Sequence, residues 1–158
     1  MAMPNAVARY AEDYRIGEIV DVGEYTMTKE EIVAFAQQWD PQPFHLDEQA
    51  AAATMFGGLI ASGWHVALIM MRMMLRSEFI SAETSLGSPG FDGLKWLMPV
   101  RPGDRLSGTV EVTNVRISRS KPDIGFVTTV ARLRNQSNEE VYWLNSTAIV
   151  KSRAAAPA

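Results

Sequence analysis

The stretch that determines the fold is residues 63–77, GWHVALIMMRMMLRS. The pattern predicts one long helix from about Gly63 to about Ser77. Its apolar side chains cover most of the circumference: Val66, Leu68, Ile69, Met70, Met71, Met73, Met74 and Leu75. The apolar run from Leu59 to Leu75 falls short of the ~20 residues that a membrane span needs. A helix that is apolar nearly all round is wrapped by other structure.

The strands predicted to surround this helix come from the second half of the chain and from one early segment. Strand patterns occupy residues 18–27, 94–98, 110–117, 126–134 and 140–150. Within the third, the apolar alternation changes phase near Thr113-Asn114, which predicts a β-bulge. The fold class is therefore α+β, an antiparallel sheet wrapped around a long central helix. We expect the sheet to bury one side of that helix, and a second subunit or the strand rim to cover the rest.

Two shorter helices are predicted between the early strand and the central helix. Thr28-Lys29-Glu30-Glu31 reads as a capping box at the start of the first. That helix ends at Asp40, because a residue before proline is forced out of the α region. Asp47 reads as the N-cap of a second helix through the alanines at 50–53.

Length and composition describe one soluble domain. The chain has 158 residues, a net charge of −3 and no cysteine. The mild acidity argues against a nucleic-acid surface, and the missing thiols exclude disulfides and zinc–sulfur sites. No signal peptide is recognised, so a cytoplasmic location without membrane attachment is expected. We predict a single domain over residues 1–158 with a disordered tail from about residue 152.

The chemistry is concentrated in residues 40–45, DPQPFH. Asp40 and His45 offer an acid/base pair, and the two prolines restrict the backbone between them. Downstream, residues 56–63 lead into the start of the central helix, where developing negative charge is stabilised. Taken singly, Asp40 is also compatible with a turn, and His45 with a structural loop position.

These residues resemble the hydratase motif of the MaoC-like, R-specific enoyl-CoA hydratases. Residues 60–63 (IASG) match the loop before their central helix, and residues 86–90 and 98–104 are similar to further family segments. The resemblance spans about Tyr14 to Val150. Two residues depart from the family pattern. Gln42 stands where the motif has asparagine, and Ser62 where many members have histidine.

The resemblance implies a hotdog fold, a homodimer or higher homo-oligomer, and reversible hydration of trans-2-enoyl thioesters. By that analogy Asp40 and His45 are catalytic and hold one water. The backbone N–H of Gly63 stabilises the thioester oxygen, and Gln42 and Ser62 contact substrate. No metal or redox cofactor is implied, since coenzyme A is part of the substrate, and the carrier is either coenzyme A or acyl carrier protein.

Other interpretations stay open beside this one. The enzyme has two rivals, a non-catalytic acyl-thioester-binding hotdog domain and a hotdog thioesterase. A metal site from Asp40, His45 and Asp47 lacks a fourth ligand. His65 reads as a structural or pocket-lining histidine. The basic cluster at residues 116–121 is either a coenzyme A phosphate site or a solvated sheet edge.

Overall fold

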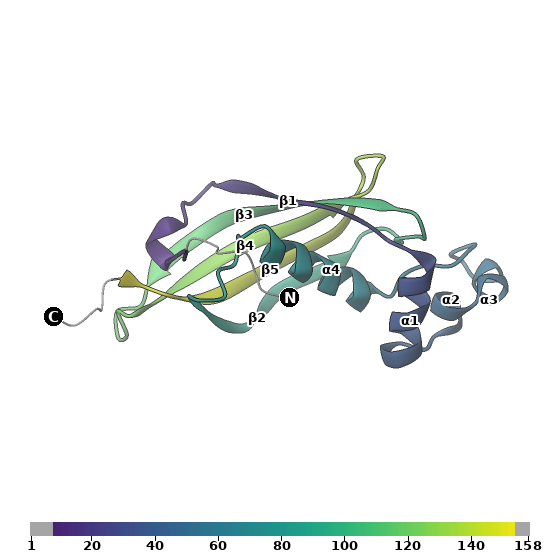
Figure 1. Cartoon of the computed structure of the whole chain (residues 1–158), viewed down its shortest axis with the longest axis horizontal. Helices are drawn as coiled ribbons and strands as arrows, with labels where there is room; N and C mark the ends of the chain where they lie inside the picture. Colours follow the sequence, from purple (N-terminus) through teal and green to yellow (C-terminus); the bar gives the residue numbers. More distant parts are fainter. Residues whose placement is uncertain (1–7, 154–158) are drawn as a thin grey trace.

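The structure is a computed structural model that describes residues 8–153. Its helical elements are η1 (Ala11–Asp13), α1 (Lys29–Trp39), α2 (Pro43–Leu46), α3 (Glu48–Ala52) and α4 (Gly63–Arg76). Its strands are β1 (Ile19–Thr26), β2 (Ser85–Trp96), β3 (Arg105–Ile117), β4 (Ile124–Arg134) and β5 (Glu140–Lys151). The sheet curves over α4, and the three short helices gather at one end of the molecule (Figure 1). The predicted α+β architecture is confirmed.

The five strands form one sheet in the order β1-β3-β4-β5-β2, and every neighbouring pair is antiparallel. The predicted bulge is present, because the β3–β4 register shifts between Val112 and Asn114. The strand predicted at 94–98 is wrong in both bounds, since β2 begins at Ser85 and ends at Trp96. Three register shifts around glycines 87, 90 and 93 break its alternation, and this hides the first half of the strand in the sequence.

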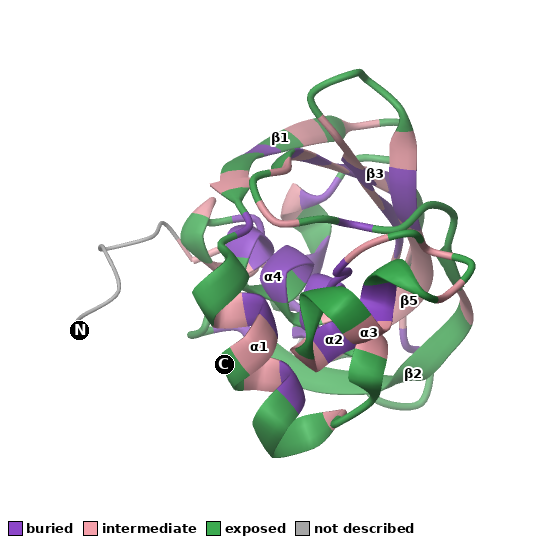
Figure 2. Cartoon of the chain, turned by 90° about the vertical axis from the view of Figure 1, so that its right-hand side faces the viewer, coloured by how far each residue is buried: buried purple, intermediate pink, exposed green. Residues whose placement is uncertain are grey.

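Helix α4 packs against the concave face of the sheet with one side only. Its buried residues are His65, Val66, Ile69, Met70, Met73 and Met74. On β3, a Cβ at Gly108 would lie 2.6 Å from Val22 Cγ2 and 2.9 Å from Met73 Cε, so a glycine lets the helix approach the sheet closely. Figure 2 shows buried residues along α4 beneath the strands. Within one chain neither the sheet nor its rim covers the opposite face of α4, where Trp64, Leu68 and Met71 are exposed, and its cover by a second subunit stays a prediction.

The segment between β1 and α4 carries the short helices. Thr28 caps α1 in a complete capping box with Glu31, and α1 ends at Trp39 with Asp40 outside the helical region. Asp47 accepts a hydrogen bond from the Ala50 N–H at the start of α3, which confirms both predicted caps. Helix α2 is unpredicted. Pro43 is its first residue, a position that the fixed φ of proline suits.

The two ends of the described chain are joined. Ser152 is buried and its hydroxyl donates to Glu12, while Arg153 forms a two-pronged ion pair with Asp13. The remainder of the predicted tail, residues 154–158, lies outside the described residues. Within residues 8–153, no helix has the length and apolar character needed to cross a lipid bilayer.

Candidate active site

Asp40 is positioned by the end of α1. Its N–H donates to the Ala36 carbonyl, while its own φ and ψ of −150° and 68° turn the chain out of the helix. Pro41 enforces this turn, because a residue before proline avoids the α region. The carboxylate is thus aimed away from α1 toward the loop that precedes α4.

His45 approaches Asp40 from α2. Its Nε2 lies 3.3 Å from Asp40 Oδ2, and its Nδ1 lies 2.9 Å from the Ile60 carbonyl oxygen. A carbonyl oxygen only accepts, so Nδ1 donates to it, and Nε2 is the ring atom that faces Asp40. The histidine is only 4% exposed. Helix α2 and the Ile60 contact hold the ring within the packed structure.

Two further donors hold the Asp40 carboxylate. Ser62 Oγ donates to Oδ2 at 2.6 Å, and Gln42 Nε2 donates to Oδ1 at 2.7 Å. Partial burial acts to raise the pKa of Asp40, but these two hydrogen bonds and the charge of His45 outweigh it, so the pKa is lowered. Asp40 is therefore an ionised carboxylate at neutral pH, with both oxygens oriented.

The N-terminus of α4 follows directly after Ser62. The first hydrogen bond of the helix runs from the Val66 N–H to the Ser62 carbonyl, so the amides of residues 63–65 precede the helical ladder. Gly63 lines a cavity of about 350 Å³ that also contains Asp40 and His45. The remaining walls are Gln42, Phe44, Phe56, Ile60, Ala61, Trp64, Val66, Trp96, Leu97, Met98, Pro99, Val100 and Val141. One cavity thus joins a carboxylate, an imidazole and a helix N-terminus.

The structure brings the predicted site residues together, although their catalytic roles stay predictions. Gln42 lines the cavity, but its amide is engaged by Asp40. Ser62 is fully buried, and its hydroxyl donates to Asp40. The structure therefore gives both side chains a contact with the carboxylate, and substrate contact by either remains a prediction. Asp47 stands apart as the cap of α3.

His65 belongs to the packing between helices. Its ring stacks on Phe35 of α1 with 4.7 Å between ring centres, and it is buried with no hydrogen-bond partner for Nδ1. Burial lowers its pKa, and the nearby Glu31 charge offsets this only in part. The structural interpretation of His65 fits this environment.

The basic cluster lies far from the acid/base pair. Helix α1 follows Thr26, which pairs with Arg105 at one end of β3, whereas the turn at residues 118–123 follows the other end, Ile117. Thirteen strand residues separate the two ends by roughly 40 Å. Within one chain the cluster cannot hold the phosphates of a thioester bound at Asp40, and Arg116 instead stacks over Phe126.

Sequence reasoning missed the aromatic wall of this cavity. Trp96, the last residue of β2, donates from Nε1 to the Gly63 carbonyl at 2.8 Å. Trp64 packs edge-on against the same indole, with ring centres 5.2 Å apart. An apolar residue near a strand end signals packing alone, and a contact across 33 positions leaves no local pattern.

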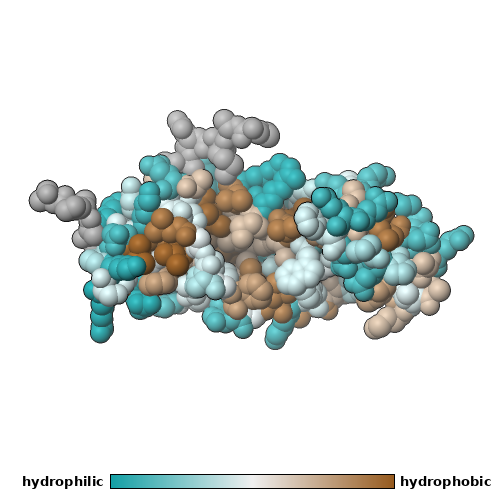
Figure 3. Space-filling view, turned by 90° about the horizontal axis from the view of Figure 1, so that it is seen from below, coloured by the Kyte–Doolittle hydropathy of each residue, from teal (hydrophilic) through white to brown (hydrophobic). Residues whose placement is uncertain are grey.

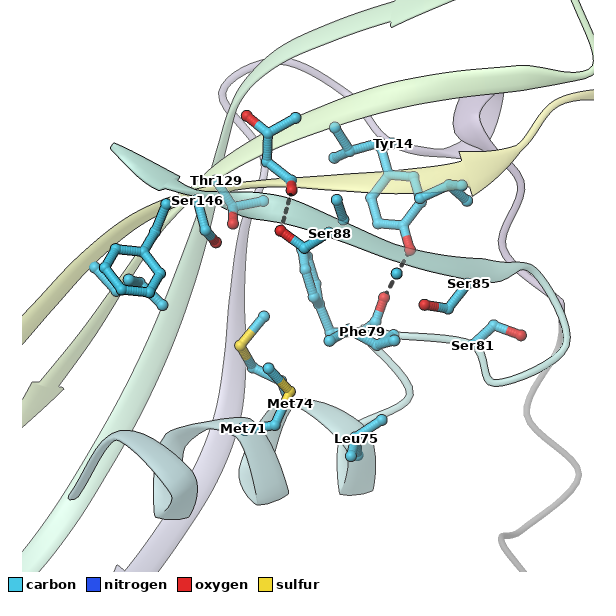
Figure 4. Close-up of a pocket in the computed structure, with 18 of the residues that line it drawn as sticks. Tyr14, Met71, Met74, Leu75, Phe79, Ser81, Ser85, Ser88, Thr129 and Ser146 are labelled. Atoms are coloured by element: carbon cyan, nitrogen blue, oxygen red, sulfur yellow. Dashed lines mark hydrogen bonds between the residues drawn. The ribbon is translucent and has the colours of Figure 1, made fainter. Parts of the chain in front are cut away.

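A second, more enclosed cavity of about 400 Å³ lies at the other end of α4. Figure 4 shows Met71, Met74 and Leu75 of α4 at its floor, and Ser88 and Tyr14 above them. The polar groups are largely engaged within the protein: Tyr14 Oη donates to the Phe79 carbonyl, and Ser88 Oγ to the Thr147 carbonyl. The described residues that line this cavity are mostly apolar, and Tyr14 is the only one among them with an ionisable side chain.

Comparison with known proteins connects this geometry to a family. The model of the MaoC like domain matches residues 13–132. An (R)-specific enoyl-CoA hydratase from Rhodospirillum rubrum is 33% identical over 122 residues, which cover 73% of this chain and 77% of the relative.

Solved structures agree. A MaoC-like dehydratase from Rhodospirillum rubrum superposes with a TM-score of 0.86 and 39% identity, covering 92% of this chain and 99% of the other. A Mycobacterium tuberculosis protein with a double hotdog fold reaches a TM-score of 0.75 at 18% identity, over 96% of this chain and 46% of the other. The second likeness concerns the fold alone, and identifies the sheet around α4 as a hotdog fold.

Proposed function

The chain belongs to the MaoC-like dehydratase family, and from this and the geometry of its cavity we propose that it catalyses the reversible hydration of trans-2-enoyl thioesters. The observation that carries the proposal is the contact between Asp40 and His45, 3.3 Å apart, in one cavity with the N-terminus of α4. The product is a 3-hydroxyacyl thioester, which we propose has R stereochemistry at C3.

The reaction adds the oxygen of a water to C3 and a proton to C2. Asp40 Oδ2 and His45 Nε2 are too close for a water to fit in line between them. A water beside the pair can reach both atoms. In the proposed mechanism the pair accepts the proton that the water loses and delivers a proton to C2. General acid–base assistance of this kind contributes roughly 10²–10⁴ in rate.

Negative charge moves onto the thioester oxygen as water attacks C3. The Gly63 amide at the start of α4 is the proposed donor to that oxygen, aided by the helix dipole. A donor of this kind contributes on the order of 10²–10³ in kcat. The proposed reaction needs no metal or redox cofactor, and coenzyme A or acyl carrier protein enters as part of the substrate. A cytoplasmic location stays a prediction.

The proposed enzyme is a homodimer. An apolar stripe on α4, made of Trp64, Leu68 and Met71, is 54%, 57% and 43% exposed. Beside it, β2 is the edge of the sheet opposite β1 and leaves one row of backbone groups unpaired. Apolar patches gather on the face seen in Figure 3. A second copy covers such a surface with two-fold symmetry.

Turnover of crotonyl-CoA tests the proposed function. Loss of the absorbance of the conjugated thioester measures hydration, and chiral chromatography gives the configuration of the product. Asp40→Asn and His45→Gln are each expected to lower kcat by about 10²–10⁴. Asp47→Asn is the matched control, because Asp47 caps α3 and is expected to retain turnover.

Each rival has its own outcome in this assay. Saturable binding of crotonyl-CoA without turnover would support a non-catalytic binding domain. Release of free thiol would support a thioesterase. Near-normal turnover by Asp40→Asn or His45→Gln, with folding checked by circular dichroism, would refute the proposed mechanism.

A further inference from the structure

Trp96 covers the first residue of α4. A Cβ built on Gly63 would lie 2.4 Å from Trp96 Cε2 and 2.6 Å from Cδ2 and Nε1. The glycine at this position is therefore required by the indole ring that lies on its Cα. The glycine at position 63 is thus explained by a residue 33 positions away.

The same indole is also tied to the peptide that follows Gly63. Trp96 Nε1 donates to the Gly63 carbonyl at 2.8 Å, and this carbonyl belongs to the peptide whose N–H is that of Trp64. The hydrogen bond therefore fixes the plane of the first peptide of α4. The Gly63 N–H lies on the other side of the shared Cα, and the indole packed against that Cα limits the space into which this N–H can rotate.

Trp96 reaches this position from a different part of the fold. It is the last residue of β2 and pairs with Tyr142 of β5, which is fully buried in the core. The strand pairing thus fixes the backbone of Trp96 in the sheet, and the indole in turn contacts the N-terminus of α4. Trp64 packs edge-on against the same ring, and both tryptophans line the cavity that contains Asp40 and His45.

We propose that Trp96 is a positioning residue that holds the Gly63 amide in the orientation needed to stabilise the thioester oxygen. Its indole N–H acts through the Gly63 carbonyl and touches no reacting atom. The inference rests on the proposed function and adds to it a residue that the hydratase motif does not contain. Placement matters in such a site, because small displacements of a catalytic group cost large factors in rate.

Trp96→Phe is the decisive variant, because phenylalanine keeps an aromatic ring over Gly63 and removes the donor. We expect kcat for crotonyl-CoA to fall by about tenfold, a part of the 10²–10³ that loss of a whole donor costs. We expect KM to stay within about twofold. The affinity for butyryl-CoA, which cannot be hydrated, should also be unchanged in calorimetry.

Trp143→Phe is the matched control. Trp143 also packs over a glycine of β2, where a Cβ on Gly93 would lie 2.8 Å from its ring, but it lines neither of the two cavities described above. It is expected to keep the wild-type kcat. A kcat for Trp96→Phe within twofold of wild type, or an equal loss in Trp143→Phe, would overturn the inference.

The same assay separates failure of the proposed function from failure of the inference about Trp96. Absence of turnover in the wild-type protein refutes the proposed function and this inference with it, whereas normal wild-type turnover with an unaffected Trp96→Phe refutes the inference alone. If Trp96→Phe does not fold, Trp96 is replaced by 3-benzothienylalanine, which keeps the shape of the indole and lacks its N–H. The loss of the hydrogen bond to the Gly63 carbonyl predicts the same tenfold fall in kcat, and a kcat within twofold of wild type would contradict the inference.

Discussion

At the scale of single residues, the state of Asp40 is set by its hydrogen bonds. Ser62 and Gln42 each donate to one carboxylate oxygen, and both contacts favour the ionised form. They oppose the effect of partial burial, and the net result is a lowered pKa. The two positions that depart from the family pattern are thus the two donors to Asp40.

A shift of the pH–activity profile follows from removing either donor. Gln42→Ala and Ser62→Ala should raise the pKa of Asp40, because each leaves the carboxylate less stabilised while burial is unchanged. As the pH falls, each variant then loses the activity that needs ionised Asp40 at a higher pH than the wild type does. The acidic limb of kcat/KM against pH reports the pKa in the free enzyme.

Gln42→Ala is the cleaner of the two variants, since Gln42 is exposed and Ser62 is fully buried. Gln49→Ala, on the exposed side of α3, serves as the control. An acidic limb that stays in place in both donor variants would show that these hydrogen bonds do not set the ionisation of Asp40.

Residue types and spacing predicted the central part of the site. Asp40, His45 and Gly63 were identified because an acid, a base and the start of a helix can each be recognised from the residues around them. The contact between Ser62 and Asp40 was not predicted, since donation by a buried serine 22 positions away depends on the path of the loop. The role of Trp96 was not predicted either, because its contact with Gly63 spans 33 positions.

At the scale of elements, the contact between α1 and α4 holds a buried neutral histidine. His65 stacks on Phe35, and burial is the main cause of its lowered pKa. The unfolded chain therefore binds a proton more readily than the folded chain between the two pKa values. The stability that the neutral His65 ring contributes is fully present above its pKa in the unfolded chain, about 6.5. It is lost as the pH falls through the lower pKa that His65 has in the folded chain.

His65→Phe should remove this dependence while keeping the aromatic stack. We expect the free energy of unfolding of the wild type, measured by urea titration, to fall relative to that of the variant between pH 7.5 and pH 5.5. Parallel pH dependences of the two proteins would contradict this assignment.

Element boundaries were predicted where local chemistry marks them. Thr28 and Asp47 were identified as caps because capping uses side chains close in sequence. The first half of β2 was missed because its glycines shift the register and interrupt the alternation. Helix α2 was missed because two prolines in three residues read as extended chain, although Pro43 starts the helix.

At the scale of the whole molecule, the proposed dimer has the open face of α4 at its interface. The apolar stripe on this face is exposed in the single chain, and β2 is an edge strand of the sheet. A charge in the centre of the stripe should prevent association. Leu68→Glu is therefore expected to shift the protein from dimer to monomer in size-exclusion chromatography with light scattering.

Ile16→Glu is the matched control, because Ile16 is an exposed apolar residue between η1 and β1. It should leave the molar mass unchanged. A wild-type protein that is monomeric at micromolar concentration would contradict the proposed dimer, as would a Leu68→Glu variant that keeps the dimer mass.

The joined ends of the described chain have a practical consequence. The pairs Ser152–Glu12 and Arg153–Asp13 hold η1 beside the end of β5, and Figure 1 shows both at the end of the sheet remote from α1 and α2. A label attached at η1 or at Arg153 therefore lies at the end of the sheet remote from α1 and α2 (Figure 1). Protein immobilised through such a label should present the cavity that contains Asp40 and His45 toward the solution.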